Sequence, residues 1–369
     1  MPAPSLEECC DACLRRTALL ALLAPHVEVA RHDRRLSGLL TLADHELLAA
    51  IAGRKRAWFE AAIERFDADA ARATAARAGL AQLCRHAAGY PARLLEGADA
   101  PAVLHTLGDR SSLPVATTPA VAVVGARRAS AYGLEVARAL GRGLAAAGVP
   151  VVSGMALGID SAAHTGALEA GGPTIAVLAG GADRAYPRSK ATLHRRIAAT
   201  PGCSVVSEMP PGFVPFRWGF PARNRIIAGL ADTTIVVEAA ERSGSLITAE
   251  LAQELGRLVA AVPGAVTNPM AAGANALLRD GAELVRGAQD VLDALLGAGV
   301  RVVADGPDPA ALEAPLRALL DRLGPRPATS TALLRSGEAP DAVVAGLAEL
   351  ELLGYARRVP GGAYVLAAG

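Results

Sequence analysis

Two short segments of this chain carry residue types that bind phosphate groups. In Phe216–Leu230, Pro221 suits the first turn of a helix, and the arginines of Arg223-Asn224-Arg225 flank an amide. Ser243-Gly244-Ser245, one predicted strand further on, opens a second helix. Backbone N–H groups at a helix start, with guanidinium groups beside them, bind anions well. Because only one strand separates the two segments, we predict that they form a phosphate-binding surface.

The ends of the other predicted strands carry similar residues. In open α/β sheets, ligands bind beyond the carboxyl ends of the strands. Each strand end here has a glycine, a hydroxyl or an arginine, which can approach or bind a phosphate. The predicted binding residues are Gly125, Arg127, Arg128, Ser130, Ser153, Gly154, Gly158, Arg188, Lys190, Arg223, Asn224, Arg225, Ser243, Gly244 and Ser245.

The distribution of charge favours a polyanionic partner. The whole chain has a net charge of +1. Residues 121–230 hold 12 Arg or Lys against 5 Asp or Glu, a balance of +7, whereas the rest of the chain holds 25 against 31, a balance of −6. A local positive field on a nearly neutral protein is typical of a protein that binds a polyanion at one face.

Two common nucleotide-binding motifs are missing from the sequence. A dinucleotide fold needs Gly-x-Gly-x-x-Gly after its first strand, but Arg127 occupies the second glycine position. A P-loop needs Gly-Lys-Ser/Thr, and the only lysines, Lys55 and Lys190, are not in such a motif. We therefore expect neither nicotinamide chemistry nor P-loop ATP hydrolysis, and no cofactor.

Candidates for acid–base catalysis are few. His164 follows Asp160 by one helical turn, so the two could transfer a proton, although a capping Asp and a packed His fit the same spacing. Glu250 could be a catalytic acid or a charge that stabilises its helix. Since no Ser/His/Asp or Cys/His arrangement stands out, we predict a protein without a catalytic site.

The cysteines predict neither a disulfide framework nor a metal site. Five are present, an odd and clustered set: Cys9, Cys10, Cys13, Cys84 and Cys203. Cys10-x-x-Cys13 is half of a zinc-type spacing, but no second pair lies within the usual distance, so we expect structural thiols and no metal. Without an 18-residue apolar run or a signal-peptide pattern, we expect a cytoplasmic protein.

Three regions must position these residues. Residues 1–95 are predicted to be a helical domain, with helices at Cys13–Leu23, Asp44–Ala52, Arg56–Phe66, Asp69–Arg77 and Leu80–His86, and residues 96–119 a linker. Residues 120–298 alternate buried strands with amphipathic helices, which predicts a doubly wound, mostly parallel, Rossmann-like α/β domain. After a linker at 299–309, residues 310–369 read as three helices and a Gly-Gly hairpin, a winged helix.

Several motifs, in order, resemble the DprA/Smf DNA-processing family. They are Val124-Gly125-Ala126-Arg127, Ser153–Asp160 with Ala163-His164, Tyr186-Pro187, Phe220–Ile227 and Arg242–Thr248. The resemblance covers about Tyr90 to Leu296. The cysteine-rich start of the chain is not a general feature of that family.

The resemblance implies a non-catalytic protein that binds single-stranded DNA and forms a homodimer through its α/β domain. It also implies that the protein helps load a RecA-type recombinase during natural transformation. By matching position, Arg127 and Arg188 would be the main DNA contacts, brought into one crevice by neighbouring strands. Because the α/β domain shows a positive field but no groove-reading helix, we expect binding without sequence preference.

Two alternatives remain open. Nucleotide-phosphate hydrolases of the same fold family release a base with a Gly-Gly-x-Gly-Thr-x-x-Glu helix start, and Ser243–Glu250 occupies the corresponding place without the glycine run. A winged helix is also typical of regulators that bind duplex DNA, but its second and third helices here have few positive charges, so we expect a modest or absent DNA role. For the aromatic residues nearby, we expect Phe220 to fill the core and Trp218 to be exposed, where a base could stack.

Overall fold

The structure is a computed structural model, and it describes two compact units. The units are Met1–Val300 and Arg301–Gly369. The described residues are 9–30, 36–113, 118–298, 312–323, 328–335, 337–353, 355–358 and 362–366. Within these ranges, no helix has both the length and the apolar character needed to cross a membrane.

The first unit begins with helices. Their bounds are α1 (Asp11–Ala30), α2 (Leu36–Leu40), α3 (Asp44–Ile51), α4 (Arg56–Glu64) and α5 (Ala68–Arg77). One residue from each of the first four helices shows how they pack, since Leu19, Leu39, Leu47 and Phe59 share one buried cluster. The helices predicted at 13–23, 44–52, 56–66 and 69–77 are confirmed.

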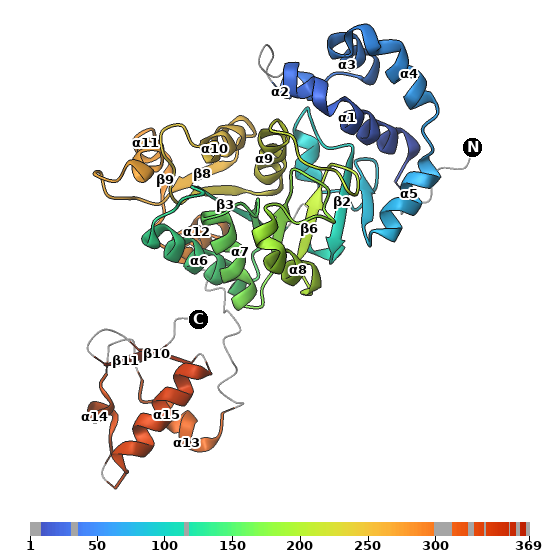
Figure 1. Cartoon of the computed structure of the whole chain (residues 1–369). Helices are drawn as coiled ribbons and strands as arrows, with labels where there is room; N and C mark the ends of the chain where they lie inside the picture. The colour runs from blue at the N-terminus through green and yellow to red at the C-terminus, as the bar shows by residue number, and fades with distance from the viewer. Residues whose placement is uncertain are drawn as a thin grey trace. The chain divides into compact units, whose positions relative to one another are not determined.

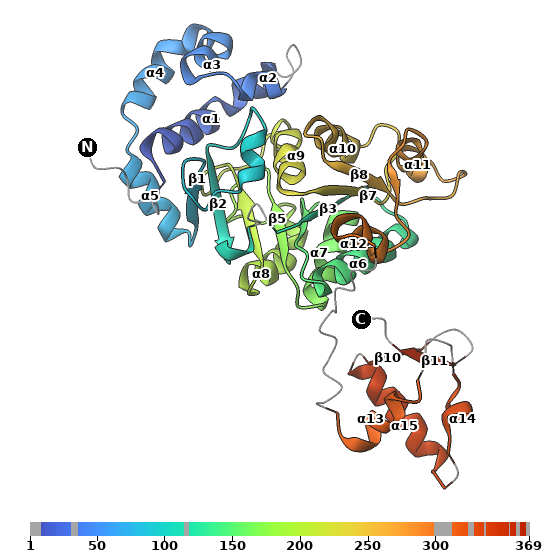
Figure 2. The same cartoon turned by 180° about the vertical axis from the view of Figure 1, so that it is seen from behind.

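A nine-stranded sheet forms the centre of the first unit (Figures 1 and 2). Its strands are β1 (Ala81–Cys84), β2 (Val103–Gly108), β3 (Val121–Val124), β4 (Val151–Ser153), β5 (Thr174–Val177), β6 (Ser204–Ser207), β7 (Thr233–Val236), β8 (Leu258–Ala261) and β9 (Glu283–Leu284). Their order across the sheet is β1-β2-β6-β5-β4-β3-β7-β8-β9. The β1–β2 and β2–β6 pairs are antiparallel, and the other neighbouring pairs are parallel.

Both faces of the sheet are covered by helices. Side chains alternate between faces along a strand, so Ala122 and Val124 of β3 join one buried cluster while Val121 and Val123 join another. One face is covered by α9 (Gly219–Leu230), α10 (Gly244–Glu254) and α11 (Ala272–Arg279), and the other by α6 (Ala131–Ala146), α7 (Ile159–Glu169), α8 (Ala191–Ala199) and α12 (Ala288–Leu296) (Figure 1). The predicted doubly wound, mostly parallel fold is confirmed.

The structure corrects the prediction at the junction between the helices and the sheet. Residues 80–86 were expected to be a helix, but they contain strand β1, in which Leu83 pairs with Leu104 of β2. A short apolar segment does not distinguish a helix from a strand by its spacing, and here the edge of the sheet offers a pairing partner. The predicted linker 96–119 also contains a strand, β2, so the sheet begins before residue 120.

The described residues of the second unit have the elements of a winged helix. These are α13 (Ala314–Leu320), α14 (Ser330–Leu333), α15 (Pro340–Leu352), β10 (Ala356–Arg358) and β11 (Tyr364–Leu366). The two strands pair antiparallel, and Leu319, Leu333 and Leu347 share a core with Tyr364. The turn expected at residues 360–362 and the linker at 299–309 lie largely or wholly outside the described residues.

Candidate nucleic-acid interface

A crevice of about 220 Å³ opens at the carboxyl ends of the central strands. From β3, the sheet grows through β4, β5 and β6 in one direction, whereas β7 returns to the other side of β3. The chain leaving β3 therefore enters α6 on one face, and the chain leaving β7 enters α10 on the other. Such a reversal leaves a gap above the strand ends, where ligands bind in open α/β sheets.

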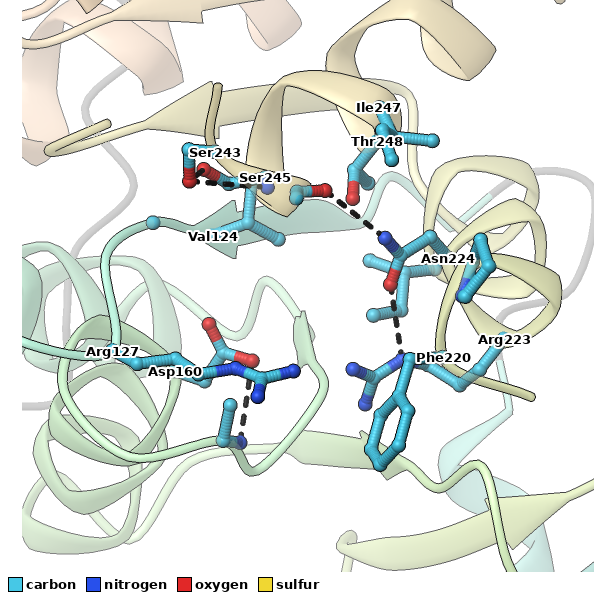
Figure 3. Close-up of a pocket in the computed structure, with 15 residues that line it drawn as sticks. Val124, Arg127, Asp160, Phe220, Arg223, Asn224, Ser243, Ser245, Ile247 and Thr248 are labelled. Carbon is cyan, nitrogen blue, oxygen red and sulfur yellow. Dashed lines mark hydrogen bonds between the residues drawn. The ribbon is translucent and has the colours of Figure 1, made fainter. Parts of the chain in front are cut away.

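Arg127, in the loop after β3, is the exposed cation of this crevice. Its guanidinium carbon lies 5.3 Å from the centroid of the Phe220 ring, within the range of a cation–π contact. Figure 3 shows its side chain extending across the crevice toward Phe220 and Arg223. None of the ion pairs found among the described residues involves Arg127, so its charge is available to a ligand.

The aromatic surface continues beyond Phe220. The ring of Tyr186 lies 5.5 Å from that of Phe220, centroid to centroid, and Tyr186 is 46% exposed. Arg188, which is also exposed, follows two residues later. The side chains of Arg127, Phe220 and Tyr186 are thus linked by ring contacts into one surface that combines a cation with two aromatic rings.

Arg223 forms the floor of the crevice and is held by the protein itself. Only 6% of it is exposed, and its Nη1 donates to the backbone oxygens of Gly154 and Val177, both at 2.6 Å. Burial lowers the pKa of Arg223 to about 10, although the carboxylate of Asp160 opposes this shift. Burial likewise raises the pKa of Asp160, against the effect of Arg223. Asp160 accepts from the backbone N–H groups of Gly154 and Ala156 at 3.2 and 3.3 Å, so it braces the loop after β4.

The start of α10 closes the crevice opposite Arg127 (Figure 3). Ser243 is the N-cap, and its Oγ lies 2.7 Å from Oγ of Ser245. The Nδ2 of Asn224 donates to the Gly244 oxygen at 3.2 Å, which ties α9 to this helix start. The first N–H groups of a helix have no partners within it, and the helix dipole gives this end a partial positive charge. Arg127 and the start of α10 therefore present positive charge from two sides.

Comparison with known proteins places this arrangement in a family. The family model for DNA recombination-mediator protein A matches residues 81–296, and that for the DprA winged helix domain matches residues 303–362. The chain belongs to the DprA family.

Individual DprA proteins are similar over most of the chain. The putative DNA processing protein DprA of Mycobacterium tuberculosis is 43% identical over 287 residues, 76% of this chain and 73% of that protein. The crystal structure of DprA from Streptococcus pneumoniae superposes with a TM-score of 0.61 at 36% identity and covers 76% of this chain and 95% of that one. DprA from Helicobacter pylori, reported for its single-stranded-DNA-binding mode, gives a TM-score of 0.53 at 32% identity over 59% of this chain and 95% of that one.

Within this DprA chain, several predicted binding residues turn out to have internal partners. Ser130 caps α6 by accepting from the Gly133 N–H at 3.0 Å, and its own hydroxyl donates to Glu238 at 2.6 Å. The Ser153 hydroxyl is fully buried and donates to the Val123 oxygen at 2.6 Å. These two hydroxyls stabilise the strand ends and do not face the crevice.

Arg225 also lies outside the crevice. It is 8% exposed and donates to Glu208 at 2.5 Å, and its Nε lies 3.4 Å from Asp99. Residues two positions apart on a helix point in different directions, so Arg223 and Arg225 cannot both face one ligand. Arg225 was predicted to be a binding residue, but the structure places it in an internal ion-pair cluster away from the crevice.

The predicted glycines make room for the protein's own loops. A Cβ on Gly154 would lie 2.1 Å from Nη1 of Arg223, and one on Gly158 would lie 2.2 Å from the Ala126 oxygen. Gly158 also has a φ of 80°, which favours glycine. Both positions thus require glycine for packing, before any ligand is considered. Gly125 and Gly244, by contrast, line the crevice itself.

Arg188 does not line the crevice with Arg127, contrary to the expectation. The strands β3 and β5 that precede the two arginines are not neighbours, because β4 lies between them. Arg188 and Lys190 belong to a 3-10 turn, Arg188–Lys190, that leads into α8. Of the predicted cations, Arg127, Arg128 and Arg188 are exposed and Lys190 is partly buried.

The candidates for acid–base catalysis, His164, Asp160 and Glu250, are buried, bonded within the protein or outside the crevice. His164 is fully buried, its Nδ1 lies 2.7 Å from the Thr174 hydroxyl, and burial lowers its pKa to about 3. His164 is therefore a packed histidine and Asp160 a residue that stabilises a loop, rather than a pair that transfers a proton. Glu250 is exposed on α10 and is not among the residues that line the crevice.

The roles of the aromatic residues were predicted wrongly. Trp218 is fully buried, and its Nε1 donates to the Ala24 oxygen of α1 at 3.0 Å, so it cannot stack on a base. Phe220 instead lines the crevice. Because α9 begins at Gly219, Trp218 and Phe220 point in different directions, and of the two only Phe220 lines the crevice.

Among the described residues, one group has the composition of a metal site, and it lies away from the crevice at the start of α1. Its members are Cys10, Cys13, Cys84 and His86.

Proposed function

We propose that this chain binds single-stranded DNA, without sequence preference, across the surface formed by Arg188, Tyr186, Phe220, Arg127 and the start of α10. A DNA strand would cross the carboxyl edge of the sheet and place a phosphate near the guanidinium of Arg127. Membership of the DprA family and the single-stranded-DNA-binding mode reported for the Helicobacter pylori relative support this proposal.

The observation that carries the proposal is the guanidinium of Arg127 lying over the ring of Phe220 at 5.3 Å. Arginine binds phosphate, and an aromatic ring offers a base a stacking partner whatever its sequence. A single strand presents both a phosphate and an unstacked base to such a pair. In a duplex, the faces of the bases are stacked inside, so a protein side chain reaches the phosphates and the base edges in the grooves but no free base face. The pairing of the two side chains therefore favours single strands.

The positive charge around this surface supports an electrostatic contribution to DNA binding that does not depend on sequence. Several arginines between residues 121 and 230 neutralise carboxylates within the protein, since Arg138 and Arg142 pair with Glu169 and Arg225 pairs with Glu208. Among the described residues of this range, the exposed arginines outside such ion pairs are Arg127, Arg128, Arg184, Arg188, Arg195, Arg196 and Arg217. They would attract the DNA backbone by a field that depends on salt.

The wider role follows from the family. We infer that the protein is a non-catalytic mediator that acts as a homodimer and helps load a RecA-type recombinase onto DNA taken up during natural transformation. The carboxylate of Asp160 in the crevice supports the non-catalytic part, because it is occupied by backbone N–H groups and lies beside Arg223. The exposed Glu250, outside the crevice, leaves a base-releasing hydrolase without an acid at its expected place.

Fluorescence anisotropy with single- and double-stranded oligonucleotides of equal length, over a salt series, tests the proposal. We expect tighter binding to the single strand, equal affinity for strands of different sequence, and weaker binding as salt rises. Equal or tighter binding to the duplex would refute it. Incubation with nucleoside monophosphates tests the enzymatic alternative, for which release of the free base is the positive result.

A further inference from the structure

A second cluster of reactive side chains lies where the first helix meets the edge of the sheet. Cys10 immediately precedes α1 and Cys13 lies in its first turn, whereas Cys84 ends β1 and His86 follows two residues later. The three Sγ atoms and a ring nitrogen of His86 all lie within 4.8 Å of one another. Nδ1 of His86 is 3.3 Å from Sγ of Cys10 and 3.4 Å from Sγ of Cys13.

The two distances from Nδ1 of His86 are close to the edges of a metal-centred tetrahedron. With Zn–S bonds of about 2.3 Å and Zn–N bonds of about 2.0–2.1 Å, neighbouring ligand atoms are about 3.6–3.8 Å apart. The two distances from Nδ1 fall slightly below this value, so a central ion requires only a small expansion. The sulfur atoms are not joined to one another, because the five cysteines are free. The four side chains therefore surround a point that each of them can reach.

The ligand set selects the metal. Three thiolates and one imidazole are soft and borderline donors, which bind Zn²⁺ well and Mg²⁺ or Ca²⁺ poorly. Four protein ligands complete a tetrahedral shell and leave no position for a substrate, which is typical of a structural site. We propose that Cys10, Cys13, Cys84 and His86 bind one structural Zn²⁺ ion.

The surroundings of the cluster favour a bound cation. Cys13 and Cys84 are buried in an apolar cluster with Leu14 and Val103. Thiolates would be costly there without a positive charge at their centre. Cys10 and Cys13 lie at the amino end of the 20-residue helix α1, whose dipole also favours anionic sulfur.

The zinc ion would connect two parts of the chain that are far apart in the sequence. Cys10 and Cys13 belong to the helical start, and Cys84 and His86 to the edge of the sheet, and His86 lies 76 positions after Cys10. This distance, and a second pair of the form Cys-x-His, explain why Cys10-x-x-Cys13 alone predicted no metal. The ion would hold the start of α1 against β1. Further along α1, the Ala24 oxygen accepts from Trp218, just before the helix that carries Phe220 and Arg223.

Metal analysis of the full-length chain tests the proposal. The protein is purified without chelator from cells grown with added Zn²⁺, and its zinc content is measured by plasma mass spectrometry. We expect one zinc ion per chain, and a tetrahedral thiolate spectrum after replacement of zinc by Co²⁺. A thiol titration under denaturing conditions, after zinc removal, should find five free thiols. A chain that binds no Zn²⁺ when it is supplied, or that contains a Cys10–Cys13 disulfide, would overturn the proposal.

Variants separate metal binding from folding. His86→Ala removes a ligand whose side chain is exposed, so it should fold and yet hold Zn²⁺ at least about tenfold more weakly in competition with a chromophoric chelator, because a tetrahedral site loses one of its four bonds. Cys13→Ser should lose the ion as well. The matched control is Cys203→Ser, a buried thiol in another cluster, which should keep one zinc ion per chain. Equal affinity of His86→Ala and the parent protein for Zn²⁺ in this competition would exclude this ligand set.

Discussion

Replacement of Arg127 by alanine should weaken binding to single-stranded DNA without unfolding the protein. The side chain is exposed and contacts the Phe220 ring at 5.3 Å, so its loss opens no core cavity. A hydrogen bond to a charged group contributes about 1.5–3 kcal/mol, which corresponds to a roughly ten- to hundredfold loss of affinity. The melting temperature should be nearly unchanged, because exposed substitutions typically alter stability by at most about 0.5 kcal/mol.

Two further measurements distinguish a direct phosphate contact from a general effect of charge. If Arg127 neutralises one phosphate of a single strand, the slope of log affinity against log salt should become shallower by about 0.7. Arg127→Lys should recover part of the loss, since lysine keeps the charge but lacks the planar group that stacks on a ring. These changes are measured by anisotropy over a salt series.

The matched control is Arg138→Ala. Arg138 is an exposed arginine of the same unit, but it pairs with Glu169 on the neighbouring helix. Its removal changes the net charge by the same amount, and we expect at most about a threefold loss because salt screens charges that lie further from the ligand. If Arg127→Ala and Arg138→Ala weaken binding equally, the crevice is not the contact site and the reasoning fails.

Four other substitutions or conditions follow from the structure. Arg188→Ala should also reduce affinity for the single strand roughly ten- to hundredfold, and an unchanged affinity would confine the contact to Arg127. Trp218→Ala should cost about 3–5 kcal/mol of stability, seen in the denaturation midpoint, since the side chain is fully buried against α1. Burial lowers the pKa of His105 to about 4 and that of His164 to about 3. At pH 5 these histidines therefore take up a proton in the unfolded chain but stay neutral in the folded protein, so the free energy of unfolding should fall by roughly 2 kcal/mol per histidine between pH 7 and pH 5. The melting temperature of His164→Gln should depend less steeply on pH. Deletion from residue 305 onward should leave affinity for single strands within about tenfold, or about 1.4 kcal/mol, and a larger loss would assign DNA contacts to the winged helix.

The order of buried strands and amphipathic helices was sufficient to predict the fold of the α/β region. Strands β3 and β6, for example, coincide with short Val-containing runs, and the amphipathic segments between the strands form helices. The junction at Leu80–His86 failed because a short apolar run takes its conformation from its partner, here β2, and the partner was not recognised. Long-range pairing of this kind is not encoded in local spacing.

The candidate site was predicted in part. The strand ends that converge on it were identified correctly, because the carboxyl ends of parallel strands share one edge, and Arg127 and Ser243-Gly244-Ser245 do line the crevice. The sequence could not show which of these side chains are free to bind a ligand. That depends on internal partners, such as Glu208 and Glu238, that come together only in the fold. The grouping of the four members of the proposed zinc site was missed for the same reason, since Cys84 and His86 come from a segment, the strand β1 and the turn after it, that was taken for a helix.

Three arginines within the family motifs, Arg127, Arg223 and Arg225, have different roles near the carboxyl edge of the sheet. Arg223 donates to backbone oxygens in the loop after β4 and at the end of β5, whereas Arg225 pairs with Glu208. With these two occupied, Arg127 is the crevice-lining arginine left without a carboxylate or carbonyl partner among the described residues. The buried pair shapes the crevice and holds its floor in place, so that binding requires little reorganisation of the protein. Replacement of Arg223 should therefore lower the stability of the fold, whereas replacement of Arg127 should lower only the affinity for the ligand.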